Sequence, residues 1–289
     1  MLFNLFTKYL AENDKITDSQ ISELNDYQKK NRVKLGLIAV AEKMITEKQA
    51  DEINRKQALE DKRFGDIAVE LGYLSGEQIG KLLDLQGNPY MKICQGLTEL
   101  GMMEMNDIED AFKGFVKEIG AKDEDIDALK SDDVDKYTSL YLPDINASYA
   151  DLALICVRTI NRIISTDLSL EKATIVNSLS VNSYALQEMN GDKKIITGMF
   201  SDGDAILKIA DGYANESFGV VDEDSLDSVG EFINIINGLY ATSLSYAKCN
   251  VELAPPNYSV GDITINADEI CVLPVTIEGK TLRVFISVK

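Results

Sequence analysis

The sequence contains no histidine. This absence excludes Ser-His-Asp and Cys-His catalytic centres and histidine-ligated metals, so any chemistry must use carboxylates, amides, hydroxyls, lysines or groups of a partner. Cysteines are few and far apart, and none belongs to a CxxC pair; they are Cys94, Cys156, Cys249 and Cys271. This pattern is typical of reduced, mostly buried cysteines of a cytoplasmic protein rather than of disulfides or a zinc site.

Basic residues are also scarce, since 29 Lys and Arg stand against 48 Asp and Glu, for a net charge of −19. So acidic a surface repels phosphate backbones and anionic lipids, which disfavours nucleic acid and membrane surfaces as partners. No apolar run approaches the ~18–20 residues of a membrane span, and the start, MLFNLFTKYLAEND, lacks the basic segment of a signal peptide. We therefore expect a soluble, cytoplasmic protein without membrane insertion.

The first part of the chain repeats itself every 29 residues. Four units cover about residues 5–118, and apolar residues recur at equivalent positions in each, as in Phe6, Leu35, Phe64 and Ile93. Three units also carry a hydroxyl residue followed three positions later by glutamine: Thr17 and Gln20, Thr46 and Gln49, Ser75 and Gln78. This spacing predicts a capping box at the start of a helix. Residues 1–120 are thus predicted to form an all-α domain of stacked helix–turn–helix repeats.

The third unit, RFGDIAVELGYLSGEQIGKLLDLQ, resembles the motif RLGxxLxxxGxxxxxxLxxxLxxQ of the MshEN-like N-terminal domain of type II secretion and pilus ATPases. Arg63, Gly65 and Gly72 hold the arginine and the two glycines of that motif. Tandem motifs bind cyclic di-GMP in that family, so the resemblance implies a nucleotide site at these residues. In the second unit, Lys34 and Lys43 replace the arginine and the second glycine. The sequence therefore favours the alternative, a helical interaction or oligomerisation module.

Residues 121–145 are dense in acidic side chains, and their apolar periodicity fades before Pro143. This composition predicts a linker. A calcium loop is the alternative, but the stretch lacks the central glycine and the terminal glutamate of an EF-hand loop. We therefore expect no metal site there.

The remaining residues, 146–289, mix predicted helices with adjacent antiparallel strands. Helices are predicted at ASYADLALICVRTINRII and at residues 202–214 and 225–246. Strands are predicted on both sides of Asn190-Gly191, a hairpin signal, and at the closing segments DITIN, ICVLPVTI and LRVFISVK. This order of elements predicts an α+β domain.

The helix predicted at 225–246 carries polar residues within an apolar run. On a helical wheel one narrow stripe contains Asp227, Glu231, Asn234 and Gly238, and the core-facing arc contains Phe232, Ile233, Ile236, Leu239 and Tyr240. Asn237 lies off the stripe, and we interpret it as structural. Gly238 costs roughly 1 kcal/mol in a helix interior, which is reasonable where another backbone or side chain approaches closely. Spacing alone leaves open whether the stripe is a solvated face or a site.

The segment GEFINIING resembles the Glu-x-x-Asn helix of the CheX/CheC/FliY family of chemotaxis phosphatases. Asp227, Glu231 and Asn234 fill that family's pattern, in which an Asp or Ser precedes the Glu by one turn and a proline follows later. Pro255 and Pro256 stand close to the place of that proline. The resemblance covers about residues 146–289, and its single Glu-x-x-Asn is more similar to CheX than to CheC.

The resemblance implies hydrolysis of the aspartyl phosphate on a CheY-like response regulator, by a domain that dimerises through its sheet. Asn234 would orient the attacking water, Glu231 would pair with the regulator's lysine, and Asp227 and Gly238 would contact the partner. The regulator would supply Mg²⁺, so no cofactor of the chain's own is implied. The alternative is a non-catalytic adaptor that binds a regulator or flagellar partner, its N-terminal repeats sensing cyclic di-GMP.

Overall fold

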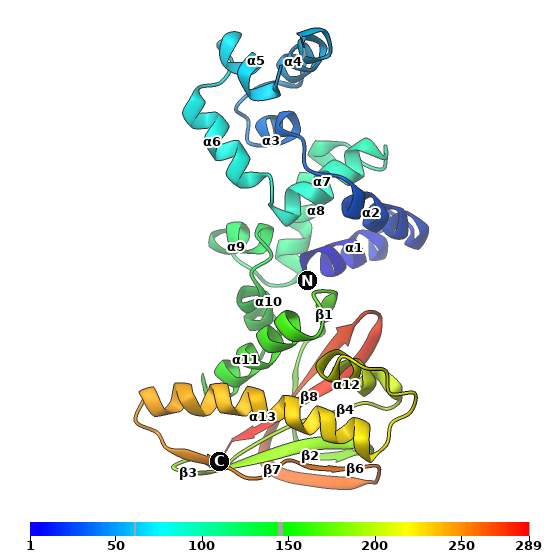
Figure 1. Cartoon of the computed structure of the whole chain (residues 1–289), viewed down its shortest axis with the longest axis vertical. Coiled ribbons are helices and arrows are strands. Elements are labelled where there is room, and N and C mark those ends of the chain that lie inside the picture. The colour runs from blue at the N-terminus through cyan, green and yellow to red at the C-terminus, as the bar shows by residue number, and fades with distance from the viewer. Residues whose placement is uncertain (61, 144–146, 289) are drawn as a thin grey trace. The chain divides into compact units, whose positions relative to one another are not determined.

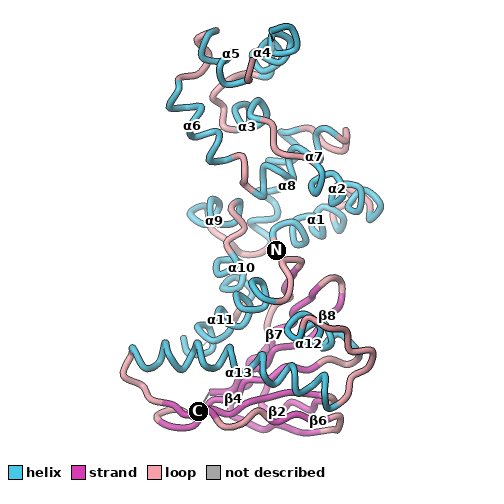
Figure 2. Tube along the Cα trace, in the orientation of Figure 1, coloured by secondary structure: helices cyan, strands magenta, loops and turns pink. Residues whose placement is uncertain are grey.

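The computed structural model describes residues 1–60, 62–143 and 147–288. The chain forms two compact units, one of Leu2–Asp132 and one that contains Asp133–Lys289. Figure 2 shows the strands in the second unit, whereas the described residues of the first form helices and loops. No helix within the described ranges is long and apolar enough to cross a bilayer.

The first unit contains helices in successive pairs: α1 (Leu2–Glu12), α2 (Asp18–Lys30), α3 (Leu35–Ala41), α4 (Glu47–Glu60), α5 (Phe64–Glu70), α6 (Gly76–Leu85), α7 (Pro89–Glu99) and α8 (Met105–Glu118). The second helices of the pairs begin 29 residues apart, at Asp18, Glu47, Gly76 and Met105. The three predicted capping boxes are confirmed, because each hydroxyl oxygen accepts from the backbone of its glutamine, whose side chain accepts in return. These caps fix where each second helix starts.

The turn inside each helix pair contains one residue in the left-handed conformation. These residues are Asp14 (φ 54°), Lys43 (φ 56°), Gly72 (φ 72°) and Gly101 (φ 67°). Glycine adopts this conformation without the steric cost that a side chain brings, and it is the common residue just beyond a helix end. The backbone of the turn therefore accounts for Gly72 without any ligand.

The segment predicted as a linker, 121–145, is helical over much of its length. It contains η1 (Asp123–Asp125), α9 (Ile126–Lys130) and α10 (Val134–Tyr141), and Leu129 and Tyr137 are fully buried. Two of its aspartates, Asp125 and Asp133, accept hydrogen bonds from backbone N–H groups at the helix starts. The acidic residues thus cap short helices, which is why a composition typical of a linker folds here. Residues 144–146 lie outside the described residues.

The second unit is α+β, as predicted. Its elements are α11 (Ala147–Ile163), β1 (Leu168–Leu170), β2 (Thr174–Val181), β3 (Tyr184–Gly191), β4 (Ile195–Phe200), η2 (Asp204–Ile206), α12 (Leu207–Ala214), α13 (Glu223–Tyr246), β5 (Val251–Leu253), β6 (Asn257–Ser259), β7 (Ile263–Ile277) and β8 (Lys280–Val288). The strands form one antiparallel sheet in the order β1-β7-β8-β4-β3-β5, with β2 also paired to β7 and β6 to β3.

Two strand predictions need correction. The segments DITIN and ICVLPVTI belong to one long strand, β7, which pairs with β2 along its first part and with β8 along its second. Asn190 and Gly191 do not form a two-residue turn, because both continue β3, where Asn190 pairs with Glu252 of β5. The last β3–β4 pair is Met189 with Ile195, so residues 190–194 together connect these two strands.

The two faces of the sheet bury different side chains. Gln187 of β3 bonds to α13, so Ala185 and Met189, two residues away on either side, share that face. Tyr184 and Leu186 point to the other face and join an apolar cluster with Phe200, Ile265, Ile270, Val272 and Phe285. Figure 1 shows α13 lying along the first face, where α11 and α12 pack against it. One long helix is thereby held against β3 and its neighbours β4, β5 and β6, toward one edge of the sheet.

All four cysteines are free thiols, and three of them are buried. Burial raises the pKa of Cys94 and Cys156 to about 12 and that of Cys271 to about 11. The thiolate is the reactive form, so these three thiols are protected both by burial and by protonation.

We expect a thiol reagent at neutral pH to label Cys249 alone in the native protein, and all four cysteines after denaturation. The native Cys249→Ser variant should stay unlabelled. Rapid labelling of any thiol besides Cys249 in the native wild-type protein would contradict this expectation.

Candidate functional site

The predicted stripe lies on the surface side of α13. Asp227 and Glu231 are exposed, and Asn234 and Gly238 are half-buried. The opposite side is buried and contains Leu226, Val229, Phe232, Ile233, Ile236 and Tyr240. The prediction of Leu239 as core-facing is wrong, because its side chain is 44% exposed, whereas Asn237 is fully buried. The centre of the buried arc is therefore rotated toward Asn237 and away from Leu239.

A short extended segment packs beside the stripe. A side chain at Gly230 would meet Pro256 at 3.0 Å, so this glycine permits the close approach of residues 254–258 to the helix. Tyr258, in β6, hydrogen-bonds the Asp227 carboxylate, and this bond raises the pKa of the tyrosine hydroxyl. At the predicted glycine, Gly238, no described residue beyond its neighbours and the adjoining helix backbone has an atom within 4 Å of the place of a side chain. The contact within the chain is therefore made at Gly230, and the surface at Gly238 is open.

Beneath the stripe lies a glutamine, Gln187, that belongs to none of the sequence motifs. Gln187 is only 1% exposed, and its amide nitrogen Nε2 donates to Asn234 Oδ1 and to the Ala254 carbonyl oxygen, each at 2.8 Å. Its Oε1 accepts from Asn237 Nδ2, also at 2.8 Å. Three amide side chains are thus connected through one buried glutamine, and Asn237 belongs to the same group as Asn234. We call Gln187, Asn234 and Asn237 the amide triad.

The two predicted catalytic side chains keep polar atoms uncommitted. Glu231 makes no ion pair, and Asn234 Nδ2 makes no hydrogen bond, with any residue in the described part of the chain. They stand one helical turn apart on the same face. A carboxylate can bind a cation of a partner, and an amide N–H can donate to water or to a phosphoryl oxygen. Within the described residues, no group of three or more carboxylates or thiols is placed to hold a metal ion.

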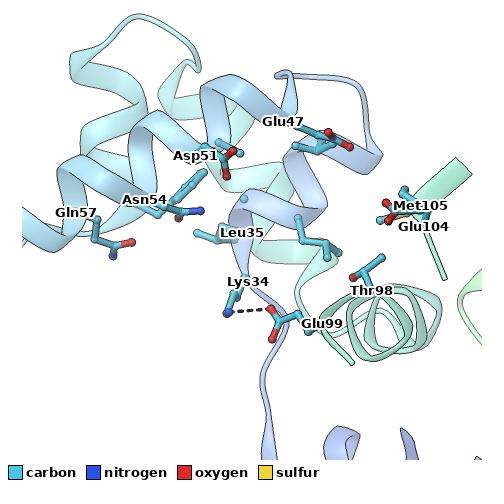
Figure 3. A pocket seen from close by; sticks show the side chains of 15 residues that line it. Lys34, Leu35, Glu47, Asp51, Asn54, Gln57, Thr98, Glu99, Glu104 and Met105 are labelled. Atoms are coloured by element: carbon cyan, nitrogen blue, oxygen red, sulfur yellow. Dashed lines mark ion pairs between the residues drawn. The ribbon is translucent and has the colours of Figure 1, made fainter. Parts of the chain in front are cut away.

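The first unit contains a separate pocket of about 900 Å³. Figure 3 shows Lys34 reaching Glu99 at its edge, an ion pair of 2.8 Å, and Glu47, Asp51 and Glu104 around it. Its carboxylates outnumber its one lysine, which disfavours the phosphates of a cyclic dinucleotide.

The three residues predicted to bind cyclic di-GMP are absent from the lining of this pocket. Arg63 and Gly65 lie at the start of α5, where a side chain at Gly65 would meet Ile79 at 3.1 Å, and Gly72 lies beyond the end of that helix. Binding of cyclic di-GMP there, like the MshEN-like resemblance itself, stays a prediction.

Comparison with protein families identifies the segment that holds the amide triad. Residues 183–272 match the family model described as chemotaxis phosphatase CheX. This part of the chain is a CheX domain. The domain includes the triad, Glu231 and the segment around Pro256, and it lies wholly in the second unit. No curated protein sequence matches the chain.

Several solved structures resemble the CheX domain and its surroundings. A CheC-like superfamily protein from Shewanella sp. PV-4 is 20% identical, covers 50% of this chain and 99% of its own, and has a TM-score of 0.44. A chemotaxis protein CheX from Desulfovibrio desulfuricans is 16% identical, with 48% and 99% covered and a TM-score of 0.41. A CheX in complex with CheY, BeF₃ and Mg²⁺, from Borrelia burgdorferi, is 16% identical, with 49% and 97% covered and a TM-score of 0.43.

Proposed function

We propose that the CheX domain hydrolyses the aspartyl phosphate of a CheY-like response regulator. The observation that carries the proposal is the placement of Glu231 and Asn234 one turn apart on the open side of α13, with the Glu231 carboxylate and Asn234 Nδ2 uncommitted among the described residues. The match of residues 183–272 to a chemotaxis phosphatase family supports it.

The reaction needs little covalent help from the phosphatase. Water attacks the phosphorus in line with the bond to the aspartate, that bond breaks, and the products are a free carboxylate and inorganic phosphate. The principal requirements are an oriented water and neutralised charge. The Asn234 amide orients the water, and the Mg²⁺ and lysine of the regulator balance the phosphoryl charge. No histidine is needed as a general base.

Glu231 has the complementary role of holding the partner in register. Its exposed carboxylate pairs with the lysine in the regulator's active site, which brings Asn234 to the phosphoryl group one turn away. The open surface at Gly238 admits the regulator's backbone or side chains. Asp227 has a further task, since its bond to Tyr258 ties the helix to β6. A homodimer through the sheet remains part of this proposal, but the mechanism does not depend on it.

A direct assay tests the proposal. The full chain is added in substoichiometric amount to a CheY-like regulator phosphorylated by a small-molecule donor, and release of inorganic phosphate is followed. We expect release faster than from the regulator alone, with every regulator molecule turned over. Binding of the phosphorylated regulator without faster release would contradict the phosphatase and favour the adaptor alternative.

A further inference from the structure

We propose that Gln187 is a positioning residue, which fixes the Asn234 amide with its Nδ2 directed toward the regulator. The inference rests on the proposed phosphatase function and concerns the same site. Nothing in the Glu-x-x-Asn pattern includes Gln187, which comes from a strand 47 residues before Asn234. Its role follows from the hydrogen bonds of the amide triad.

The orientation of the triad is determined by a single backbone atom. The Ala254 carbonyl oxygen can only accept, so the Gln187 atom that lies 2.8 Å from it must be the donor Nε2. The second hydrogen of that nitrogen faces Asn234, so the asparagine must turn its acceptor, Oδ1, inward. An amide has only two ends. With Oδ1 held by Gln187, Nδ2 is the end of Asn234 left to meet a partner.

The third member of the triad holds Gln187 from the other side. Asn237 is fully buried, and its Nδ2 donates to Gln187 Oε1. The other end of the same amide, Asn237 Oδ1, has no hydrogen-bond partner within the described residues. Burying a polar atom without a partner costs free energy that an apolar residue would avoid. Packing alone therefore does not account for an asparagine here, whereas fixing the rotation of Gln187 does.

The loss of Gln187 has a chemical consequence at the surface. Without the inward donor, the Asn234 amide is free to rotate by half a turn and present Oδ1 outward. An oxygen in that place repels the phosphoryl oxygens that a nitrogen would hold through a hydrogen bond. The effect falls on turnover rather than on docking, because Glu231 lies outside the triad and keeps its place on the helix.

The test compares the full chain with Gln187→Met in the phosphate-release assay. We expect kcat to fall roughly tenfold, the rate equivalent of one hydrogen bond, with KM for the phosphorylated regulator unchanged. Gln95→Met is a matched control, because Gln95 is also buried (2% exposed), bonds to Tyr27 and to the backbone at Arg32 and Lys34, and belongs to the first unit. That variant loses a buried amide of the same kind, and its kcat should not change.

A second background separates positioning from a general loss of structure. If Gln187 acts through Asn234, then Gln187→Met has no further effect on kcat in an Asn234→Ala chain. If Gln187→Met instead lowered kcat by the same factor in the wild-type and in the Asn234→Ala chain, the inference would be overturned. Should Gln187→Met fail to fold, Asn237→Ala removes the second support of Gln187 and is expected to lower kcat with KM kept. A Gln187→Met variant that folds and keeps the wild-type kcat would also overturn the positioning role, but not the proposed phosphatase activity. A wild-type chain without activity would overturn the phosphatase activity itself.

Discussion

Asn234→Asp is expected to lower kcat for release of phosphate by roughly 100-fold, with a much smaller change in KM. Aspartate has the shape of asparagine, and one of its oxygens still accepts from Gln187 Nε2, so the triad and the fold survive the change. The outward atom becomes a negatively charged oxygen instead of an N–H donor. It can no longer donate to the water or the phosphoryl group, and its charge repels the phosphoryl oxygens.

Asn215→Asp is the matched control for this prediction. It makes the same substitution at an exposed position whose left-handed backbone both residues tolerate, and it adds the same negative charge. Its kcat should equal that of the wild type.

Asn234→Ala should also lose activity. In addition, its free energy of unfolding should fall by about 1 kcal/mol, because Gln187 loses one hydrogen-bond partner. Unchanged turnover in Asn234→Asp would remove Asn234 from the mechanism.

Local sequence signals predicted the helices well. The capping boxes at Thr17, Thr46 and Ser75 mark where helices start, because a cap uses residues only three positions apart. The same holds for α13, whose apolar spacing predicted its extent to within a few residues. Leu239, predicted to face the core, is exposed for a physical reason. A wheel gives the relative angles of side chains, but the sheet beneath decides which angle becomes the centre of the buried arc.

The amide triad could not be found from local patterns. Gln187 and Asn234 lie 47 residues apart, and their contact depends on which face of β3 meets the helix. That face is set by the register with β4, and a shift of one residue would turn Gln187 to the other side. One signal was present: Asn237 sits among apolar residues of the helix, and a buried amide requires a partner somewhere. The sequence indicates that such a partner exists without indicating where.

Glu231→Lys is expected to raise KM for the phosphorylated regulator roughly 10- to 100-fold, equivalent to about 1.4–2.8 kcal/mol. The wild-type carboxylate is exposed and pairs in the proposed complex with a lysine of the regulator, which a lysine at this position would repel. Glu231→Gln removes the charge and keeps the shape, so its KM should lie between those of the wild type and the lysine variant. The graded order would identify charge, rather than bulk, as the cause.

Glu223→Lys provides the control on the same helix. It changes the net charge by the same two units at another exposed position of α13. The eight residue steps from Glu223 to Glu231 correspond to about 12 Å along the axis, which exceeds the Debye length of ~8 Å at physiological ionic strength. Glu223→Lys should therefore leave KM close to the wild-type value. Equal rises in KM for both variants would mean that the regulator responds to the overall acidity of this surface, and Glu231 would lose its specific role in docking.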